Sequence, residues 1–185
     1  MDRRAFLIAS ARIAALAALG PLGACTQPSG PVKFDRDPFT LGVASGDPIP
    51  EGVVLWTRLA PDPLHGGGMP QQSVDVEWLV ARDDAMKDVV RTGTVSAIPE
   101  LAHSVHVDVK GLDPNRVYSY RFRAGGVESP IGRTWTAPPA GAVLNLRFAF
   151  ASCQNYAHGY YTAHAAIARE DLHLVLFLGD YIYRV

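Results

Sequence analysis

Hydrophobic and polar residues alternate along much of the chain between residues 39 and 138. In the segment 74–81, Val and Trp alternate with Asp and Glu, and in the segment 104–109 three valines alternate with His and Asp. Alternation with a period of two predicts half-buried β-strands, because successive side chains point to opposite faces of a sheet. The expected strands, separated by Gly, Pro and Asp clusters, are Phe39–Ser45, Val53–Leu59, Val74–Ala81, Val89–Val95, Ser104–Val109, Val117–Ala124 and Gly132–Thr136. Strands of this number and spacing predict an antiparallel β-sandwich.

One corner of this sandwich has a recognisable pattern. The segment Leu112–Phe122 resembles the loop-to-strand corner of fibronectin type III and immunoglobulin-like domains, in which a tyrosine hydroxyl bonds to the upstream backbone. We expect Tyr118 to be that corner residue. No cysteine pair lies within the sandwich, so its stability must come from burial.

Two further features in this region receive structural interpretations. Gly42, Gly46 and Asp47-Pro48 are expected to form a turn, since their spacing is not that of a phosphate-binding loop. His103 and His106 are expected on opposite faces of a strand, as surface residues or as supports of a site.

The pattern changes after the stiff segment 137–141, which contains Pro138 and Pro139. An apolar strand is expected at Leu146–Ala151, a helix at Tyr160–Glu170, and a second strand at Leu174–Leu178. The last run is continuously apolar, which is typical of a parallel strand buried on both faces. The order predicts one β-α-β unit with parallel strands.

Candidate chemistry follows both strands of this unit. Cys153 lies just after the first strand, Asp180 follows Gly179 after the second, and Tyr183 lies three residues further on. The carboxyl ends of parallel strands meet at one edge of a sheet, so these side chains can converge. Carboxylate and phenolate are hard donors and thiolate is a soft one; the mixed set suits ferric iron, with Asp180 able to bridge to a second divalent cation. The alternatives are a small buried Cys153, a solvent-facing Asp180 and a packing Tyr183.

Composition narrows the function classes. With 48% hydrophobic and 19% charged residues, the chain is globular rather than disordered. The formal net charge of -1, with no basic run beyond the N-terminus, gives no nucleic-acid-binding signature. The two cysteines, Cys25 and Cys153, have separate predicted roles, so we expect no structural disulfide.

Residues 1–25 predict an export signal. Arg3-Arg4 precede the apolar, Ala-rich run Ile8–Leu22, which is short for a membrane span and carries Arg12. Paired arginines at this position indicate the twin-arginine export machinery, which carries folded proteins. Residues 26–37 are the expected linker.

Three outcomes are possible at the end of this signal. Residues 22–25, ending in Cys25, resemble a bacterial lipobox, in which the cysteine is lipidated after cleavage. Cleavage without lipidation is one alternative, and a cytoplasmic N-terminal helix is another. The expected location is therefore exported, in the periplasm or at the cell surface, with membrane attachment by a lipid anchor if Cys25 is modified.

Several motifs together resemble the alkaline phosphatase D (PhoD-like) family. They are Phe148–Gln154, Gly179–Tyr183, Leu41–Pro48, Val53–Arg58, Ala102–His106 and Ser129–Thr134. The resemblance runs from Phe39 to Tyr183. It implies a mainly β N-terminal sandwich at 38–138, followed at 142–185 by the first β-α-β unit of a calcineurin-like α/β metallophosphatase domain.

The resemblance also implies an activity. The family hydrolyses phosphomonoesters and phosphodiesters with a metal-activated water at an iron–calcium centre. Matched position by position, Cys153, Asp180 and Tyr183 correspond to iron ligands, and Asp180 also contacts calcium. The Gly-Asp-x-x-Tyr pattern is shared with purple acid phosphatases.

The chain departs from the family pattern at its end. Arg184 follows Tyr183, where the family usually has an acidic residue, and the segments that supply the remaining Asn, Asp and His ligands are missing. We therefore expect the first part of a longer enzyme, inactive as these 185 residues alone. The alternative is a non-catalytic exported β-sandwich binding module with a vestigial tail, which a downstream reading frame carrying the missing ligands would exclude.

The export hypothesis gives the first prediction. Replacing Arg3 and Arg4 by Lys should hold a reporter fusion in the cytoplasm, because the export machinery recognises the paired arginines. Cell fractionation measures this, and normal export of the variant would contradict it. Labelling with a fatty-acid analogue should be lost in Cys25→Ala if the lipobox is used.

Overall fold

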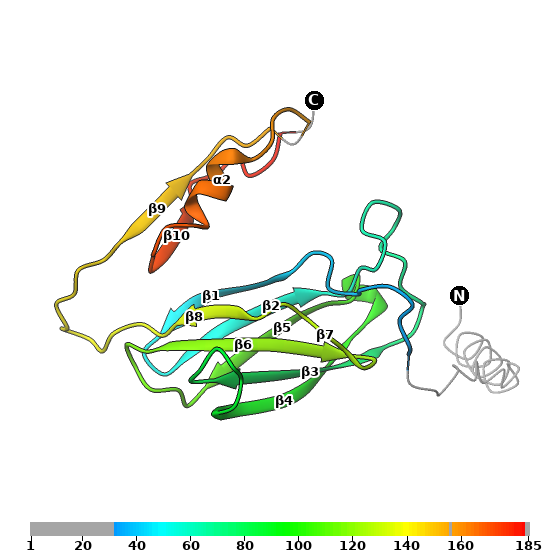
Figure 1. The fold of residues 1–185 in the computed structure, drawn as a ribbon, viewed down its shortest axis with the longest axis horizontal. Coiled ribbons are helices and arrows are strands. Elements are labelled where there is room, and N and C mark those ends of the chain that lie inside the picture. The colour runs from blue at the N-terminus through cyan, green and yellow to red at the C-terminus, as the bar shows by residue number, and fades with distance from the viewer. Residues whose placement is uncertain (1–31, 156, 184–185) are drawn as a thin grey trace, which may run out of the picture. The chain divides into compact units, whose positions relative to one another are not determined.

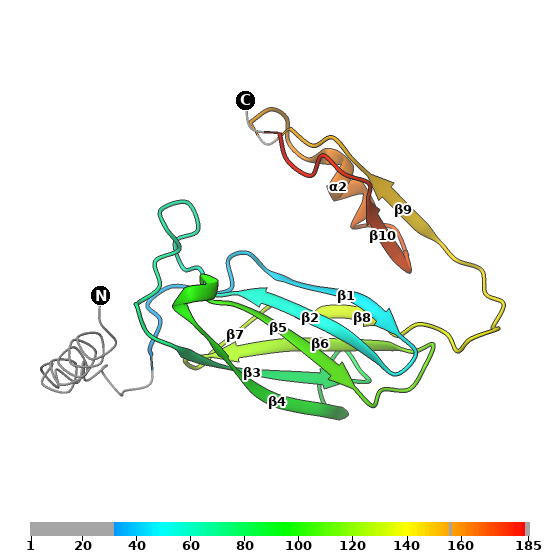
Figure 2. The same ribbon diagram turned by 180° about the vertical axis from the view of Figure 1, so that it is seen from behind.

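Two antiparallel sheets form the larger part of the computed structural model, which describes residues 32–155 and 157–183 (Figure 1). The first sheet has the strand order β1-β2-β5, with β1 Val43–Ile49, β2 Gly52–Arg58 and β5 Ser104–Lys110. The second has the order β4-β3-β6-β7, with β8 also paired to β6; its strands are β3 Val74–Ala81, β4 Val89–Ala97, β6 Val117–Ala124, β7 Val127–Glu128 and β8 Gly132–Trp135. A short 3₁₀ turn, η1 Pro99–Leu101, precedes β5. Figure 2 shows β1, β2 and β5 side by side.

The core lies on the inward face of each strand, as alternation requires. The buried side chains include Val53, Leu55, Val105, Val107 and Val109 from the first sheet and Val74, Val76, Val80, Tyr118, Tyr120 and Phe122 from the second. The outward residues His106 and Asp108 are exposed. The predicted mainly β sandwich is therefore confirmed, and β7 is a strand that the pattern did not predict.

The first strand begins later than expected. Residues 39–41 form a turn in which the Gly42 amide donates to the Phe39 carbonyl, with Gly42 at φ +73°. The turn expected at Gly46–Pro48 is instead an irregularity inside β1, between Gly46 and Ile49 of its pairing with β2. Pro48 is tolerated there because an edge strand with a bulge does not need every backbone N–H.

His103 is the second correction. It precedes β5 rather than lying on it, has a left-handed φ of +56°, and is only 4% exposed. Its Nε2 is 3.0 Å from the Gln72 carbonyl oxygen, so the imidazole satisfies a backbone acceptor. The expectation of a surface residue was wrong because strand periodicity does not apply to a left-handed residue at the strand's entrance. His106 is exposed, as predicted.

The tyrosine corner forms as predicted. The Asp113 amide donates to the Tyr118 hydroxyl at 2.8 Å, and Tyr118 is 1% exposed. Thr136 reinforces the same loop, since its hydroxyl donates to the Asp113 carbonyl at 2.7 Å and accepts from the Arg116 amide at 3.0 Å. A buried ring therefore fixes the loop through a polar tip.

The remaining elements form a parallel β-α-β unit. It comprises β9 Phe148–Ala151, α2 Thr162–Ile167 and β10 Leu174–Phe177, and β9 pairs with β10 in register from Phe148↔Leu174 to Ala151↔Phe177. The helix is shorter than the expected Tyr160–Glu170. Tyr161, just before it, has a left-handed φ of +52°, so the helix begins only at Thr162.

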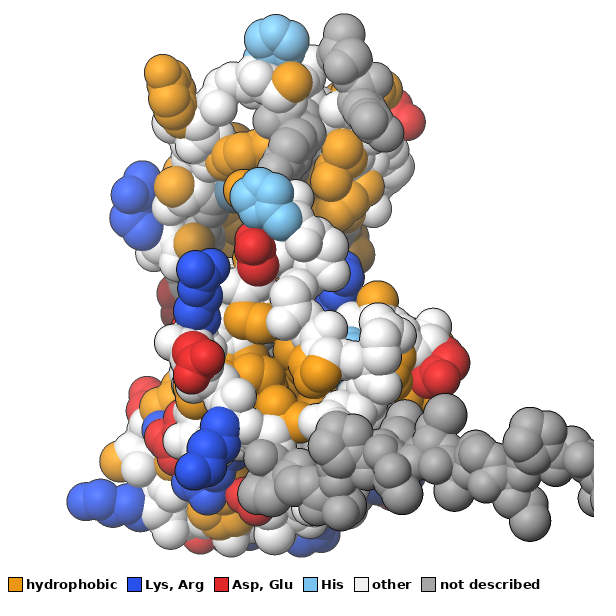
Figure 3. Space-filling model, turned by 90° about the vertical axis from the view of Figure 1, so that its right-hand side faces the viewer, with side chains coloured by type: hydrophobic (Ala, Val, Ile, Leu, Met, Phe, Trp, Pro, Cys, Tyr) orange, Lys and Arg blue, Asp and Glu red, His pale blue; other side chains and the backbone are white. Residues whose placement is uncertain are grey.

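The strand β10 is not buried on both faces within the described residues. Val175 is 49% exposed, and Phe150 on β9 is 64% exposed. Hydrophobic side chains are visible on the surface in Figure 3. The continuous apolar run did predict a parallel strand, but its burial also requires layers on both faces.

The part of the chain that the structure describes contains no helix long and apolar enough to cross a membrane. The expected export signal, residues 1–25 with Cys25, lies outside the described residues.

The corner gives the second prediction. Tyr118→Phe should lower the free energy of unfolding by about 1–2 kcal/mol, because the Asp113 amide loses its acceptor while the ring volume is kept. Urea unfolding followed by tryptophan fluorescence measures the change. Tyr160→Phe is the matched control, since Tyr160 is 93% exposed. Equal transition midpoints for the two variants would contradict the role of the corner.

Candidate metal centre

Backbone pairing between the two strands of the β-α-β unit continues beyond the strands themselves. The Leu178 amide donates to the Ala151 carbonyl at 2.9 Å, and the Cys153 amide donates to the Gly179 carbonyl at 3.4 Å. One residue further, the Gln154 amide donates to the Asp180 carbonyl at 3.2 Å. The two exit segments therefore run side by side, which brings residues 27 positions apart into contact.

The three predicted donors converge at this edge. Cys153 Sγ lies 3.6 Å from Asp180 Oδ2, and the Tyr183 hydroxyl donates to the same oxygen. All three residues are exposed. The juxtaposition anticipated from the strand order is thus present, whereas their role as metal ligands stays a prediction.

Two of the donors have unusual backbone conformations. Cys153 has φ +59° and Asp180 has φ +48°, while Gly179 between β10 and Asp180 has φ +116°. The left-handed region costs a non-glycine residue about 1–2 kcal/mol, and such residues concentrate at functional sites. In each exit segment the chain turns at the donor, and the two turned donors have their side chains in contact.

The local charge opposes ionisation of the phenol. The hydrogen bond to the Asp180 carboxylate, followed by that to Cys153, raises the pKa of Tyr183 well above its usual range. The nearby Asp180 carboxylate also disfavours a negative charge on the phenol. A bound cation would reverse this effect and favour the phenolate and thiolate forms.

The donor set fits a hard cation with one softer ligand. Carboxylate and phenolate oxygens suit ferric iron, and the thiolate adds a ligand that a bound cation deprotonates. Among the described residues, no cluster of three or more His, Cys, Asp and Glu side chains could hold a metal ion. The candidate centre has only two such side chains, Cys153 and Asp180, and its third donor is the phenol of Tyr183.

Sequence reasoning missed two neighbours of these donors. Gln154 is half-buried, and its Oε1 lies 2.5 Å from Nε2 of His164 on α2. The His164 ring also stacks on Phe177, with ring centroids 5.9 Å apart. The position of Gln154 directly after Cys153 was a usable signal, but nothing in the sequence indicated that His164 reaches it.

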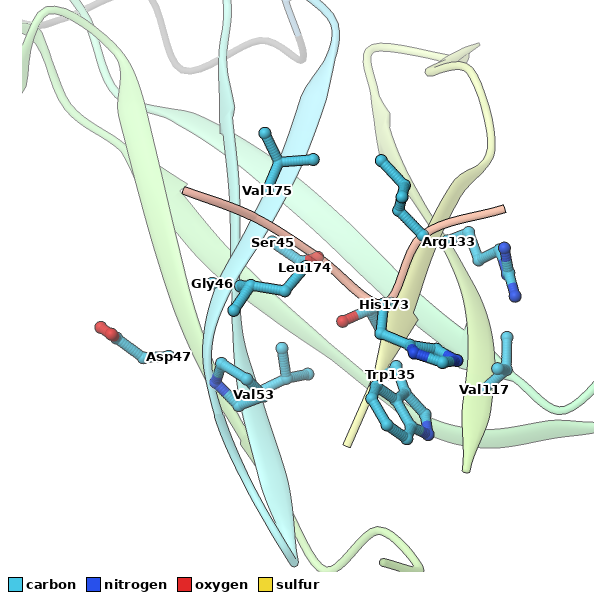
Figure 4. A pocket seen from close by; sticks show the side chains of 13 residues that line it. Ser45, Gly46, Asp47, Val53, Val117, Arg133, Trp135, His173, Leu174 and Val175 are labelled. Atoms are coloured by element: carbon cyan, nitrogen blue, oxygen red, sulfur yellow. The ribbon is translucent and has the colours of Figure 1, made fainter. Parts of the chain in front are cut away.

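A separate cavity of about 520 Å³ lies away from the donors (Figure 4). It is lined by residues of β1, β8 and the start of β10, among them Asp47, Arg133, Trp135 and His173. The Trp135 and His173 rings are 4.4 Å apart, and Arg133 pairs with Asp171 at 3.5 Å. None of the three donors lines this cavity, so the candidate centre is identified by its donor side chains and not by a cavity.

The raised phenol pKa gives the third prediction. In the metal-free protein, Asp180→Asn should lower the pKa of Tyr183 towards its ordinary value of about 10, because the phenol loses the carboxylate to which it donates its hydrogen bond and a neutral amide no longer repels the phenolate. A pH titration of phenolate absorbance measures the shift, with Tyr183→Phe subtracted to isolate this group from the other tyrosines. Superimposable curves for the wild type and Asp180→Asn would contradict the assigned cause.

Comparisons with known proteins agree with these features. The model of the PhoD-like phosphatase N-terminal domain matches residues 24–138, and the model of PhoD-like phosphatase matches residues 148–185. Alkaline phosphatase D of Bacillus subtilis (strain 168) is 56% identical over 188 residues, which cover 98% of this chain and 32% of that protein. A solved structure of PhoD superposes with a TM-score of 0.80 at 60% identity, over 82% of this chain and 29% of that one.

This chain thus spans about a third of the length of the relatives it matches. The two family models match consecutive segments, and the first alone accounts for more than half of the residues. The chain belongs to the PhoD-like phosphatase family.

Proposed function

We propose that this chain carries part of the metal centre of an exported phosphoester hydrolase. Cys153, Asp180 and Tyr183 would bind iron, and Asp180 would also contact calcium. The observation that supports this most directly is the contact of a thiol and a phenol with one carboxylate oxygen. Membership of a phosphatase family supports a phosphomonoester or phosphodiester as the substrate.

The chemistry expected at such a centre is Lewis-acid polarisation of the P–O bond and a lowered pKa for the water that attacks phosphorus. The chain's own residues orient the ligands. Asp180 accepts a hydrogen bond from Tyr183, which holds the phenol at the same edge as the thiol of Cys153. The paired exit segments bring these side chains to the same place.

Export through the twin-arginine machinery is part of the proposal. Arg3-Arg4 and the apolar run that follows support it, and Cys25 is the proposed site of lipid attachment in the periplasm or at the cell surface. A protein exported after folding can acquire its metal before export, which suits a centre that depends on iron.

These 185 residues alone should have little phosphoesterase activity. The described residues offer three donors at the candidate centre, and each missing positioned electrostatic partner commonly costs about a hundredfold or more in rate. The whole protein's activity and substrates are accordingly proposals that reach beyond the third of the relatives' length that the chain matches.

The fourth prediction tests the centre by binding and by turnover. The purified chain should bind ferric iron supplied as a soluble chelate, measured by absorbance titration, and Asp180→Asn should bind it at least tenfold more weakly, since a central charged ligand is lost. Asp108→Asn is the matched control, because Asp108 is an exposed carboxylate on β5. A chromogenic phosphomonoester and a phosphodiester, with iron and calcium added, test activity.

Two results would contradict these expectations separately. Equal iron affinities for the wild type and Asp180→Asn would remove the assigned ligand set. Metal-dependent turnover that disappears in Asp180→Asn would support the centre but show that the chain completes a working site by itself.

A further inference from the structure

Gln154 connects all three candidate ligands through its backbone. It directly follows Cys153, its amide donates to the Asp180 carbonyl at 3.2 Å, and its carbonyl accepts from the Tyr183 amide at 2.8 Å. The neighbouring backbone hydrogen bond, from the Cys153 amide to the Gly179 carbonyl, is longer at 3.4 Å. The Gln154 backbone therefore links the segment after β9 to the segment after β10 at two points.

The side chain of Gln154 is held from α2. The carboxamide Oε1 can only accept, so His164 Nε2–H is the donor of the 2.5 Å bond. The same imidazole stacks on Phe177, the last residue of β10, at an interplanar angle of 19°. Phe177 in turn contacts the Tyr181 ring edge-on, with centroids 4.6 Å apart. His164 thus touches the segment after β9 and the end of β10 at once.

The other restraints on these segments are their backbone pairing and the Asn155 carboxamide, which accepts from the Ala157 and His158 amides. The helix α2 has six residues and no side-chain cap at its N-terminus. Cys153 and Asp180 both have left-handed φ values and lie on exposed loops. Backbone conformations of this kind persist only where the surroundings enforce them. The half-buried His164–Gln154 bond is well placed to supply that enforcement.

We infer that His164 is a positioning residue, which holds the candidate ligands in register through its hydrogen bond to the Gln154 side chain. The inference rests on the proposed function for its purpose, since it concerns ligands of the proposed centre. His164 lies outside the donor set and acts through Gln154. Partners that orient metal ligands in this way commonly change metal affinity about 10- to 100-fold when they are removed.

Two substitutions separate the hydrogen bond from ring packing. His164→Gln keeps an N–H donor at nearly the position of imidazole Nε2 but loses the ring. His164→Phe keeps a ring that can stack on Phe177 but has no donor. His106→Ala controls for the loss of an imidazole, since His106 is exposed on β5.

The first readout uses the metal-free chain. Amide hydrogen exchange of Gln154 and Tyr183 should be roughly tenfold faster in His164→Phe than in the wild type. The reason is that the variant loses the hydrogen bond from His164 to the Gln154 side chain, which restrains the exit segments. His164→Gln and His106→Ala should exchange like the wild type. Exchange that is unchanged in His164→Phe, or that is accelerated only in His164→Gln, would overturn the inference.

The second readout is iron binding, with ferric iron supplied as a soluble chelate. Phenolate bound to ferric iron absorbs visible light by charge transfer, so the band reports Tyr183 directly. We expect about 10- to 100-fold weaker binding in His164→Phe and near-normal binding in His164→Gln. Wild-type binding in His164→Phe would overturn the positioning role. Absence of the band in the wild type, with the exchange pattern as expected, would overturn the proposed function while leaving His164 as the residue that orders these segments.

Discussion

Parallel pairing of β9 with β10, continued past the ends of both strands, is the interaction on which the candidate centre depends. The in-register pairs from Phe148↔Leu174 to Ala151↔Phe177 place Cys153 beside Gly179 and Asp180. A slip of one residue would displace one donor by about 3.3 Å along the strand and turn its side chain to the other face. The contact between thiol and carboxylate would then be lost, although no donor had changed.

The two folded parts of the described chain are stabilised differently. The sandwich buries alternating side chains from both sheets and fixes its corner with the Tyr118 hydroxyl. The β-α-β unit leaves Phe150 and Val175 largely exposed and relies on backbone pairing and a few directed contacts. Ion pairs such as Arg133–Asp171 lie on exposed side chains and add little, because water and salt screen them. Local opening should therefore be easier around the candidate centre than in the sandwich.

This difference gives the His164–Gln154 bond its importance. The bond links a short helix to the segments that carry the donors, and those segments are largely exposed, so little buried packing holds them in place if the bond is lost. When no cation is bound, the raised pKa keeps Tyr183 protonated, so its hydroxyl donates to Asp180 and joins these two side chains directly. Second neighbours of the ligands are thus as important to the proposed centre as the ligands themselves.

The sequence alone determined the sandwich, the change of pattern after residue 141 and the three candidate donors, because these follow from period-two alternation, turn residues and the chemistry of side chains at strand ends. Tyr118 was predictable for the same reason, since its corner is local in the chain. Tertiary structure decided what depends on distant neighbours. His103 is buried and bonds to the Gln72 carbonyl, β10 keeps exposed side chains because the described residues do not cover both of its faces, and His164 of α2 reaches Gln154 after β9. No periodicity encodes these contacts, since each joins residues whose separation along the chain is unrelated to the repeat of a helix or a strand.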